Sequence, residues 1–354
     1  MASAFNLADF NLNEGEKFDV SQIVFEAFKT KPSIQQVHDV ITGIKSGDLI
    51  PFMGLLEDVG GCIEGCDIDA TTSAIPMTNK RWAPVPVGAR LAHCERDAEK
   101  IFNGLRGRMT KEGKWDAEGS EHMQLVAQRA EDALTEIILR YGWFGDTDAE
   151  NIADGGTVTY GKDPALFNCV DGIWKQIFDL LTIYSSNYVA IAKNDEATYS
   201  AQLALASTDG RTTLRSMYEA ADTRLLASPD KVYLVTRTLF NNWMAEIEGS
   251  QVTNGTYGSV TLNGVTYTTY RNIPIIVVDY WDRMIQAYFN SGTAYHLPHR
   301  ALLTTAANIP LGFVEDNPFE VYSFYDKKDK QVYIDIEVDV DAKVLEDYML
   351  VAAY

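Results

Sequence analysis

Four carboxylates alternate with apolar residues near the end of the sequence, a spacing that could hold a cation. Counted from Asp335, acidic side chains fall at the five positions where a calcium-binding loop needs oxygen ligands: Asp335, Glu337, Asp339, Asp341 and Glu346. Such a loop also requires glycine at its sixth position, which here is Val340. The unbroken alternation from Val332 to Asp341 (VYIDIEVDVD) instead predicts a β-strand with one apolar and one acidic face.

Cysteine and histidine form a second candidate metal site. Cys62 and Cys66 are close in sequence, and His93 and Cys94 are adjacent. Structural zinc sites use two close pairs with tighter spacing, and adjacent side chains of a strand point to opposite faces. We therefore predict no metal here and expect Cys62, Cys66, Cys94 and Cys169 to be free thiols in a reducing compartment.

Hydrolase and nucleotide chemistry have little support in the motifs. The sequence has no GxSxG, GxxxxGK[ST] or GxGxxG stretch. His296 and His299 form the one close histidine pair, and Glu315–Asp316 adjoins a predicted turn. No segment brings together a base, a nucleophile and oxyanion donors, so we predict neither an enzyme nor a cofactor site. A metal-dependent α+β hydrolase that uses His296 and His299 stays as an alternative.

Composition predicts a folded, strongly acidic protein. The chain has 354 residues, 46% of them apolar and 11% aromatic, and a formal net charge of −20. This length suggests two domains, or one domain with extensions. The negative charge argues against a surface that grips phosphate backbones. No apolar run approaches the ~20 residues of a membrane span, and the start MASAFNLADFNLNEGE is not a signal peptide.

The N-terminal third divides into two segments. Residues 1–48 are predicted to form an arm, with a short helix that starts at Pro32–Ser33 and runs through Ile44 to Gly47. Phenylalanines spread through its acidic sequence could anchor it on another surface: Phe5, Phe10, Phe18, Phe25 and Phe28. Residues 49–118 contain many glycines, prolines and basic residues, which predict an extended β loop with flanking strands, after an apolar entry from Leu49 to Val59.

Helices and strands alternate through the rest of the chain. We predict a long helix from Glu121 to Tyr141, capped by Ser120 and ended by Gly142, within residues 119–145. Further helices are expected from Asp163–Pro164 through Leu181, and over Thr212–Leu226, Thr238–Glu248 and Trp281–Phe289. Strands are expected at Val232–Thr236, Val260–Tyr267 (a hairpin turning at Asn263–Gly264), Ile273–Val278, Ala301–Thr305, Phe319–Asp326, Val332–Asp341 and Tyr348–Ala353.

This order of elements resembles the major capsid protein of tailed double-stranded DNA phages, the Hong Kong 97-type fold. The resemblance is carried best by LLASPDKVYLVTRTLFNNWMAEI, VTLNGVTYTTYRNIPIIVVDYW, HRALLTTAANIPLGFVED and DIEVDVDAKVLEDYMLVAAY. It implies an α+β fold with an N-terminal arm (1–48), an extended β loop (49–118), a spine helix (119–145) and a mainly axial domain (146–300). Residues 301–354 would supply the return strands, the long hairpin of the peripheral domain and a terminal strand.

The resemblance implies a structural protein that assembles into hexamers and pentamers of an icosahedral shell around phage DNA. It would be assembled in the bacterial cytoplasm and reside in the virion, with scaffolding, portal and decoration proteins as further partners and no membrane contact. An encapsulin-like compartment with the same fold is the other alternative. Candidate contacts between subunits are Phe5, Phe10, Phe18, Lys80, Arg81, Trp82, Arg106, Arg108, Asp335, Glu337, Asp339 and Asp341.

Overall fold

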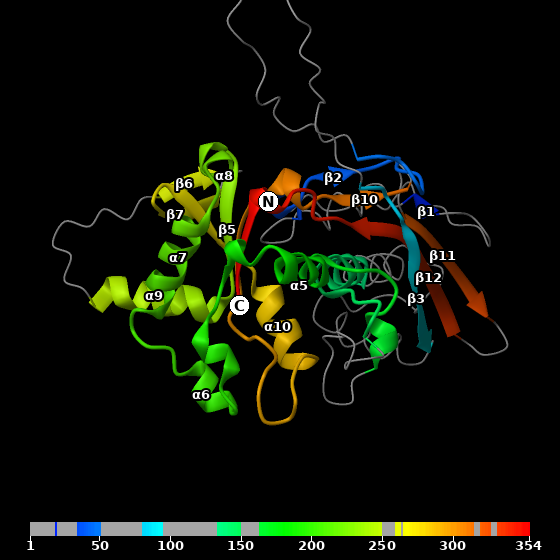
Figure 1. Ribbon diagram of the computed structural model, residues 1–354. Helices are drawn as coiled ribbons and strands as arrows, with labels where there is room; N and C mark the ends of the chain where they lie inside the picture. Colours follow the sequence, from blue (N-terminus) through cyan, green and yellow to red (C-terminus); the bar gives the residue numbers. More distant parts are fainter. Residues whose placement is uncertain are drawn as a thin grey trace, which may run out of the picture.

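The computed structural model describes nine stretches of the chain. They are residues 18–19, 34–50, 80–94, 133–149, 163–249, 259–262, 265–314, 319–326 and 331–354. Within them the chain forms two β-sheets with helices packed between and around them (Figure 1). None of the helices described has both the length and the apolar character needed to cross a membrane.

The first sheet is built around one long central strand, β12 (Gln331–Ala342). Along one edge, β12 pairs antiparallel with β3 (Val85–Cys94). Along the other edge it pairs first with β11 (Phe319–Asp326) and then with β10 (Leu311–Phe313). Short strands extend this sheet on both sides: β1 (Phe18–Asp19) on β11, and β2 (Val40–Ile41) parallel to β10. In Figure 1, β3, β12 and β11 run side by side away from the rest of the molecule.

Within the described residues the second sheet has seven strands, and its central members are buried on both faces. Their order is β4 (Tyr188–Val189), β13 (Leu350–Ala353), β9 (Ala301–Thr305), β5 (Lys231–Val235), β8 (Ile273–Val277), β7 (Val265–Tyr270) and β6 (Ser259–Leu262). Val232 and Leu234 of β5 enter one core cluster, and Tyr233 and Val235 enter another. This explains why β5 is a continuous apolar run rather than an alternating one.

Helices cover both faces of the second sheet. Residues 133–144 are helical, and the labelled α-helices are α2 (Ile34–Val37), α5 (Ile173–Ile183), α6 (Tyr199–Leu203), α7 (Asp209–Ala220), α8 (Thr223–Ala227), α9 (Arg237–Gly249) and α10 (Asp279–Ala287). Residues of α5, α10 and the 133–144 helix share one core cluster with the apolar face of β12, whereas α7 and α9 pack in the other cluster. Residues 301–354 therefore supply strands to both sheets.

The long helix continues past its predicted end. Gly142 does not stop it, and Trp143 and Phe144, only 1% and 2% exposed, lie in its last turn. The helix ends at Gly145, whose amide still donates to the Tyr141 carbonyl. Burial of two large aromatic side chains outweighs the low helix propensity of one glycine. The predicted start of this helix lies outside the described residues.

Two predicted helices are each divided in the structure. Asp163 caps Pro164–Leu166 as predicted, but that turn is a 3-10 helix, and α5 starts only after an extended Gly172. At Gly172 a Cβ would lie 2.7 Å from the amide nitrogen of Gly145, so only glycine allows this crossing. The helix predicted over 212–226 breaks after Ala220 because Asp222 caps a new helix, its Oδ1 accepting from the Arg224 amide at 2.8 Å.

One N-terminal expectation was wrong, and another lies mostly outside the described residues. The helix predicted from Pro32–Ser33 to Ile44 is described only as α2, a single turn, because Val40 and Ile41 pair with β10 as strand β2. Of the apolar stretch from Leu49 to Val59, only the first two residues are described: Leu49 is 49% exposed, and Ile50 is 3% exposed and packs in the core.

Arg300, at the start of β9, is a fully buried cation held by carbonyls and aromatic rings. Its guanidinium donates to the carbonyls of Leu297 and His296 at 2.9 and 3.2 Å. Its Cζ lies 4.9 Å from the ring centroid of Trp174 and near the rings of Phe144 and Phe178, which come from α5 and the 133–144 helix. Burial lowers the pKa of Arg300 to about 9, which leaves the group charged at neutral pH.

Arg300→Lys is expected to lower the free energy of unfolding by roughly 2 kcal/mol, because an ammonium cannot reach both carbonyls and face three rings. Arg300→Met removes every donor and should cost at least as much. Arg271→Lys is the matched control, since Arg271 also lies over a tyrosine ring but is exposed, and it should cost less than about 1 kcal/mol. Urea denaturation measures all three, and equal stability of the three variants would contradict this role.

Candidate assembly surface

The structure confirms the alternating pattern of β12. Ile336, Val338 and Val340 are at most 2% exposed and lie in the core cluster shared with the second sheet. The acidic residues occupy the intervening positions, so the strand has one face in the core and one face of carboxylates. Four carboxylates on one strand face need water, cations or hydrogen-bond donors, because an unpaired buried carboxylate is very costly.

Asp335 meets a cation within its own chain. Arg90 of β3 lies directly opposite it in the strand register, and the guanidinium donates from Nε and Nη2 to the two carboxylate oxygens at 2.5 and 2.7 Å. These hydrogen bonds lower the pKa of Asp335. The pair is largely solvent-exposed, so it adds little to stability and mainly neutralises this end of the row.

Glu337 and Asp339 have no such neighbour on β3. The residues opposite them are Gly88 and Pro86, which carry no charge. Glu337 is exposed and Asp339 is partly exposed. These two carboxylates therefore form the part of the acidic face that is open to a binding partner.

Asp341, the last member of the row, is fully buried and is used within the subunit. Its Oδ2 accepts from the Ala83 amide at 2.8 Å, and Lys343 Nζ lies 3.1 Å from Oδ1. Burial raises the pKa of Asp341 despite these contacts. The residue fixes the chain just before β3, and its side chain is closed to any neighbouring molecule.

The three predicted contact residues at positions 80–82 also differ in how open their side chains are to a neighbouring molecule. Arg81 is exposed, with Nη1 donating to the Gly47 carbonyl at 2.7 Å. Lys80 is half-buried and donates to the Val344 carbonyl, and burial lowers its pKa. Trp82 is 2% exposed and packs with Ile44, Ile50 and Leu345. Of the three, Arg81 alone presents an open side chain.

The remaining candidate contacts are only partly described. Phe18 lies in β1, paired with Val321 of β11. Phe5, Phe10, Arg106 and Arg108 fall outside the described residues, as do Cys62 and Cys66 of the weighed zinc site.

The two histidines of the alternative hydrolase differ in their surroundings. His299 is buried, and its two ring nitrogens lie 2.8 Å from Thr238 Oγ1 and from the Gln202 carbonyl, so neither nitrogen is open to a ligand. Burial and the charge of Arg300 lower the pKa of His296 to about 4. Within the described part of the chain, no group of three or more His, Cys, Asp or Glu side chains is placed to hold a metal.

Sequence reasoning missed three exposed apolar side chains that are close in sequence at and after the end of α5. Ile183 is 75% exposed, Tyr184 46% and Tyr188 37%. The buried residues of α5 run from Ile173 to Leu181, and Ile183 and Tyr184 lie beyond them. The sequence signal for this exposure was the presence of apolar residues beyond the buried face of the helix. Large exposed apolar side chains grouped in this way are typical of contact surfaces.

No family model matches the chain, and no curated protein matches it by sequence. Solved structures do match over nearly its whole length. A chain in the procapsid of satellite phage P4, a structure that includes the size determination protein Sid, is 10% identical and has a TM-score of 0.52, covering 94% of this chain and 98% of its own. A chain in the capsid of cyanophage P-SCSP1u is 14% identical and has a TM-score of 0.51, covering 100% of this chain and 93% of its own.

The chain has the fold of these phage capsid chains. This confirms the α+β fold of the Hong Kong 97 type that the order of elements implied. A chain of the holo-SrpI encapsulin complex from Synechococcus elongatus also matches, at 12% identity over 98% of this chain and 92% of its own, but its TM-score of 0.42 is too low to bear on the comparison.

Gly88→Ala is expected to weaken the pairing of β3 with β12. A Cβ at Gly88 would lie 2.7 Å from the Ile336 carbonyl oxygen, so the two strands would have to separate, at a cost of roughly 1–3 kcal/mol. The neighbouring Arg90→Ala removes only an exposed ion pair and should therefore be the more stable of the two variants. Chemical denaturation compares the two, and a Gly88→Ala variant as stable as Arg90→Ala would refute the close approach.

Proposed function

We propose that this chain is a major capsid protein of a tailed double-stranded DNA phage, which assembles into the hexamers and pentamers of an icosahedral shell. The observation that supports this is the chain-long match in fold to chains from a phage procapsid and a phage capsid. The role is structural and requires no catalysis. The protein would reside in the virion after assembly in the bacterial cytoplasm.

Three features of the chain are suited to contacts between identical subunits. The strands β3, β11 and β12 extend away from the rest of the molecule, which lets them reach a neighbouring subunit (Figure 1). Glu337, Asp339 and Arg81 present open charges of opposite sign, and the patch of Ile183, Tyr184 and Tyr188 is exposed and apolar. Large assemblies of identical subunits combine such apolar contacts with a polar rim.

The proposal also includes the N-terminal arm and the extended loop that the sequence predicts. Residues 1–48 would act as an arm and residues 49–118 as an extended loop, both lying on neighbouring subunits. Of the predicted contacts, the proposal retains Phe5, Phe10, Phe18, Arg81, Arg106, Arg108, Glu337 and Asp339. Trp82 and Asp341 are buried within the subunit, and Lys80 and Asp335 have partners there. The charge of −20 would limit adhesion to packaged DNA.

The purified chain, alone or co-expressed with a scaffolding protein, is expected to form closed particles. Velocity sedimentation and electron microscopy measure this directly. A chain that stays monomeric under all assembly conditions would refute the proposal. Particles that package protein cargo rather than DNA in the native host would instead identify an encapsulin-like compartment.

Glu337→Lys combined with Asp339→Lys is expected to lower particle yield by roughly tenfold or more, because the reversed charges would repel the basic residues of a neighbouring subunit. The isolated subunit should keep its stability, since both side chains are open to solvent. Glu248→Lys combined with Asp230→Lys, at two exposed sites in α9 and before β5, is the matched control for the change in net charge. Unchanged particle yield in the double variant would remove the acidic face from the assembly contacts.

A further inference from the structure

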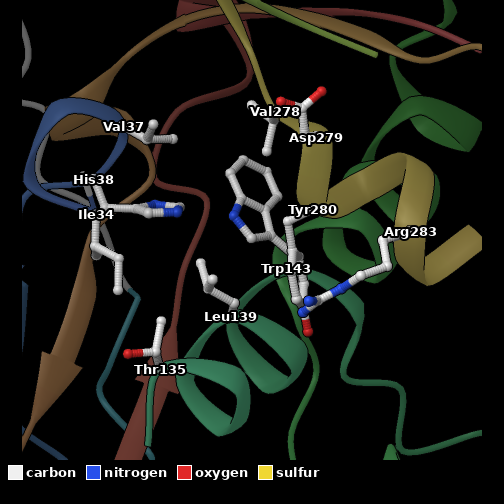
Figure 2. Close-up of a pocket in the computed structure, with 10 residues that line it drawn as sticks. All are labelled: Ile34, Val37, His38, Thr135, Leu139, Trp143, Val278, Asp279, Tyr280 and Arg283. Carbon is white, nitrogen blue, oxygen red and sulfur yellow. The ribbon is translucent and has the colours of Figure 1, made fainter. Parts of the chain in front are cut away.

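A cavity of about 280 Å³ lies where α2, the 133–144 helix and the start of α10 meet (Figure 2). Its apolar walls come from Ile34, Val37, Leu139, Trp143 and Val278. Its volume exceeds the ~150 Å³ that holds benzene in an engineered apolar cavity. One phenylalanine side chain therefore fits this space, and burying it there would remove apolar surface from water.

The cavity reaches the surface along α10. Asp279 and Arg283 of its wall are exposed, and Tyr280 and Leu139 are half-buried. Figure 2 shows Asp279, Tyr280 and Arg283 along α10, on one side of the space. An apolar anchor that enters from solvent would therefore pass these polar groups.

One cation at this opening has no carboxylate partner among the described residues. Arg237 donates from Nε and Nη2 to the Asp279 carboxylate at 2.7 and 2.6 Å, and its backbone amide donates to Asp282 at 2.8 Å. The guanidinium of Arg283 lies instead over a ring, 5.0 Å from the centroid of Tyr280. A partner that carries a carboxylate beside its apolar anchor would gain an ion pair with Arg283.

The N-terminal arm contains one such combination ahead of β1. Residues 1–17, which lie outside the described part of the chain, include two phenylalanines, Phe5 and Phe10. Asp9 directly precedes Phe10, whereas neither neighbour of Phe5 is charged. Phe10 thus offers a ring for the cavity and an adjacent carboxylate for its rim.

The position of β1 shows which copy of the chain supplies this segment. Within the described residues β1 is the last strand on one side of the first sheet, next to β11, and Figure 1 shows β11 projecting away from the part of the molecule that contains α10. The segment before Phe18 therefore starts at the periphery of its own subunit. From there Phe10 reaches at most roughly 28 Å, enough to enter a subunit in contact with that edge.

We propose that Phe10 of a neighbouring copy of this chain docks in the cavity, with Asp9 of that copy paired to Arg283. The ring packs against Leu139 and Trp143, and the backbone of the arm stays at the opening. This inference deepens the proposed shell function and rests on it, because the arm comes from another subunit of the same assembly.

A synthetic peptide of residues 1–17, labelled with a fluorophore at its carboxyl end, tests the docking on the full-length chain. Fluorescence anisotropy measures its binding without requiring a closed shell. We expect saturable binding that weakens at least tenfold when the peptide carries Phe10→Ala, because the apolar anchor is lost. Phe5→Ala in the same peptide is the matched control and should change the affinity less than threefold.

Substitutions in the full-length chain test the cavity itself. Leu139→Trp should fill the space and abolish binding of the native peptide. Leu180→Trp, at an equally half-buried leucine away from the cavity, should bind like the native chain.

A charge exchange tests the ion pair through exposed side chains, so it does not depend on how well the core tolerates tryptophan. Arg283→Glu should weaken binding of the native peptide about tenfold, and Asp9→Lys in the peptide should restore it. Arg271→Glu is the matched control, because Arg271 is also exposed and lies over a tyrosine ring, and it should bind the native peptide normally.

Three results would overturn the docking: no binding of the native peptide, binding that persists in Leu139→Trp, or equal affinities of the Phe10→Ala and Phe5→Ala peptides. Electron microscopy of the native chain tests the shell separately. Particles that form without peptide binding would reject the docking alone. Peptide binding by a chain that never forms particles would reject the shell and leave the contact between copies supported.

Discussion

The fold depends on burying one face of β12 while both of its edges remain paired. Its apolar residues share a core cluster with α5, α10, the 133–144 helix and one face of the second sheet. Backbone pairing with β3 on one side and with β11 and β10 on the other satisfies its polar groups. Burial of one face and pairing of both edges together fix the position of β3, β11 and β12 relative to the second sheet. A change in β12 therefore affects both parts of the molecule.

Local sequence patterns were sufficient to predict several short strands. The strands at 231–235, 273–277 and 301–305 and the hairpin of β6 with β7 were predicted because their patterns are short and unambiguous. Helix ends were predicted less well because distant contacts decide them. Gly142 stays helical under the packing of Trp143 and Phe144, and Gly172 interrupts a helix because another chain segment, at Gly145, touches it. Neither contact is encoded in the local sequence.

The candidate surface was predicted in outline but not residue by residue. Alternation in β12 correctly separated core residues from carboxylates, yet the four carboxylates have different environments. Their positions relative to β3 decide this, because Arg90, Gly88 and Pro86 face successive members of the row. Strand register across about 240 residues of intervening chain is a tertiary property.

The acidic face of β12 also bears on how the chain folds. In a strand, a shift of pairing by one residue exchanges the two faces. Such a shift would turn Asp335, Glu337 and Asp339 toward the core and expose Ile336, Val338 and Val340. Each unpaired carboxylate moved into the core would cost several kcal/mol, so misaligned hairpins are strongly disfavoured. The carboxylates thus select a single alignment of the longest strand before any contact with another subunit is made.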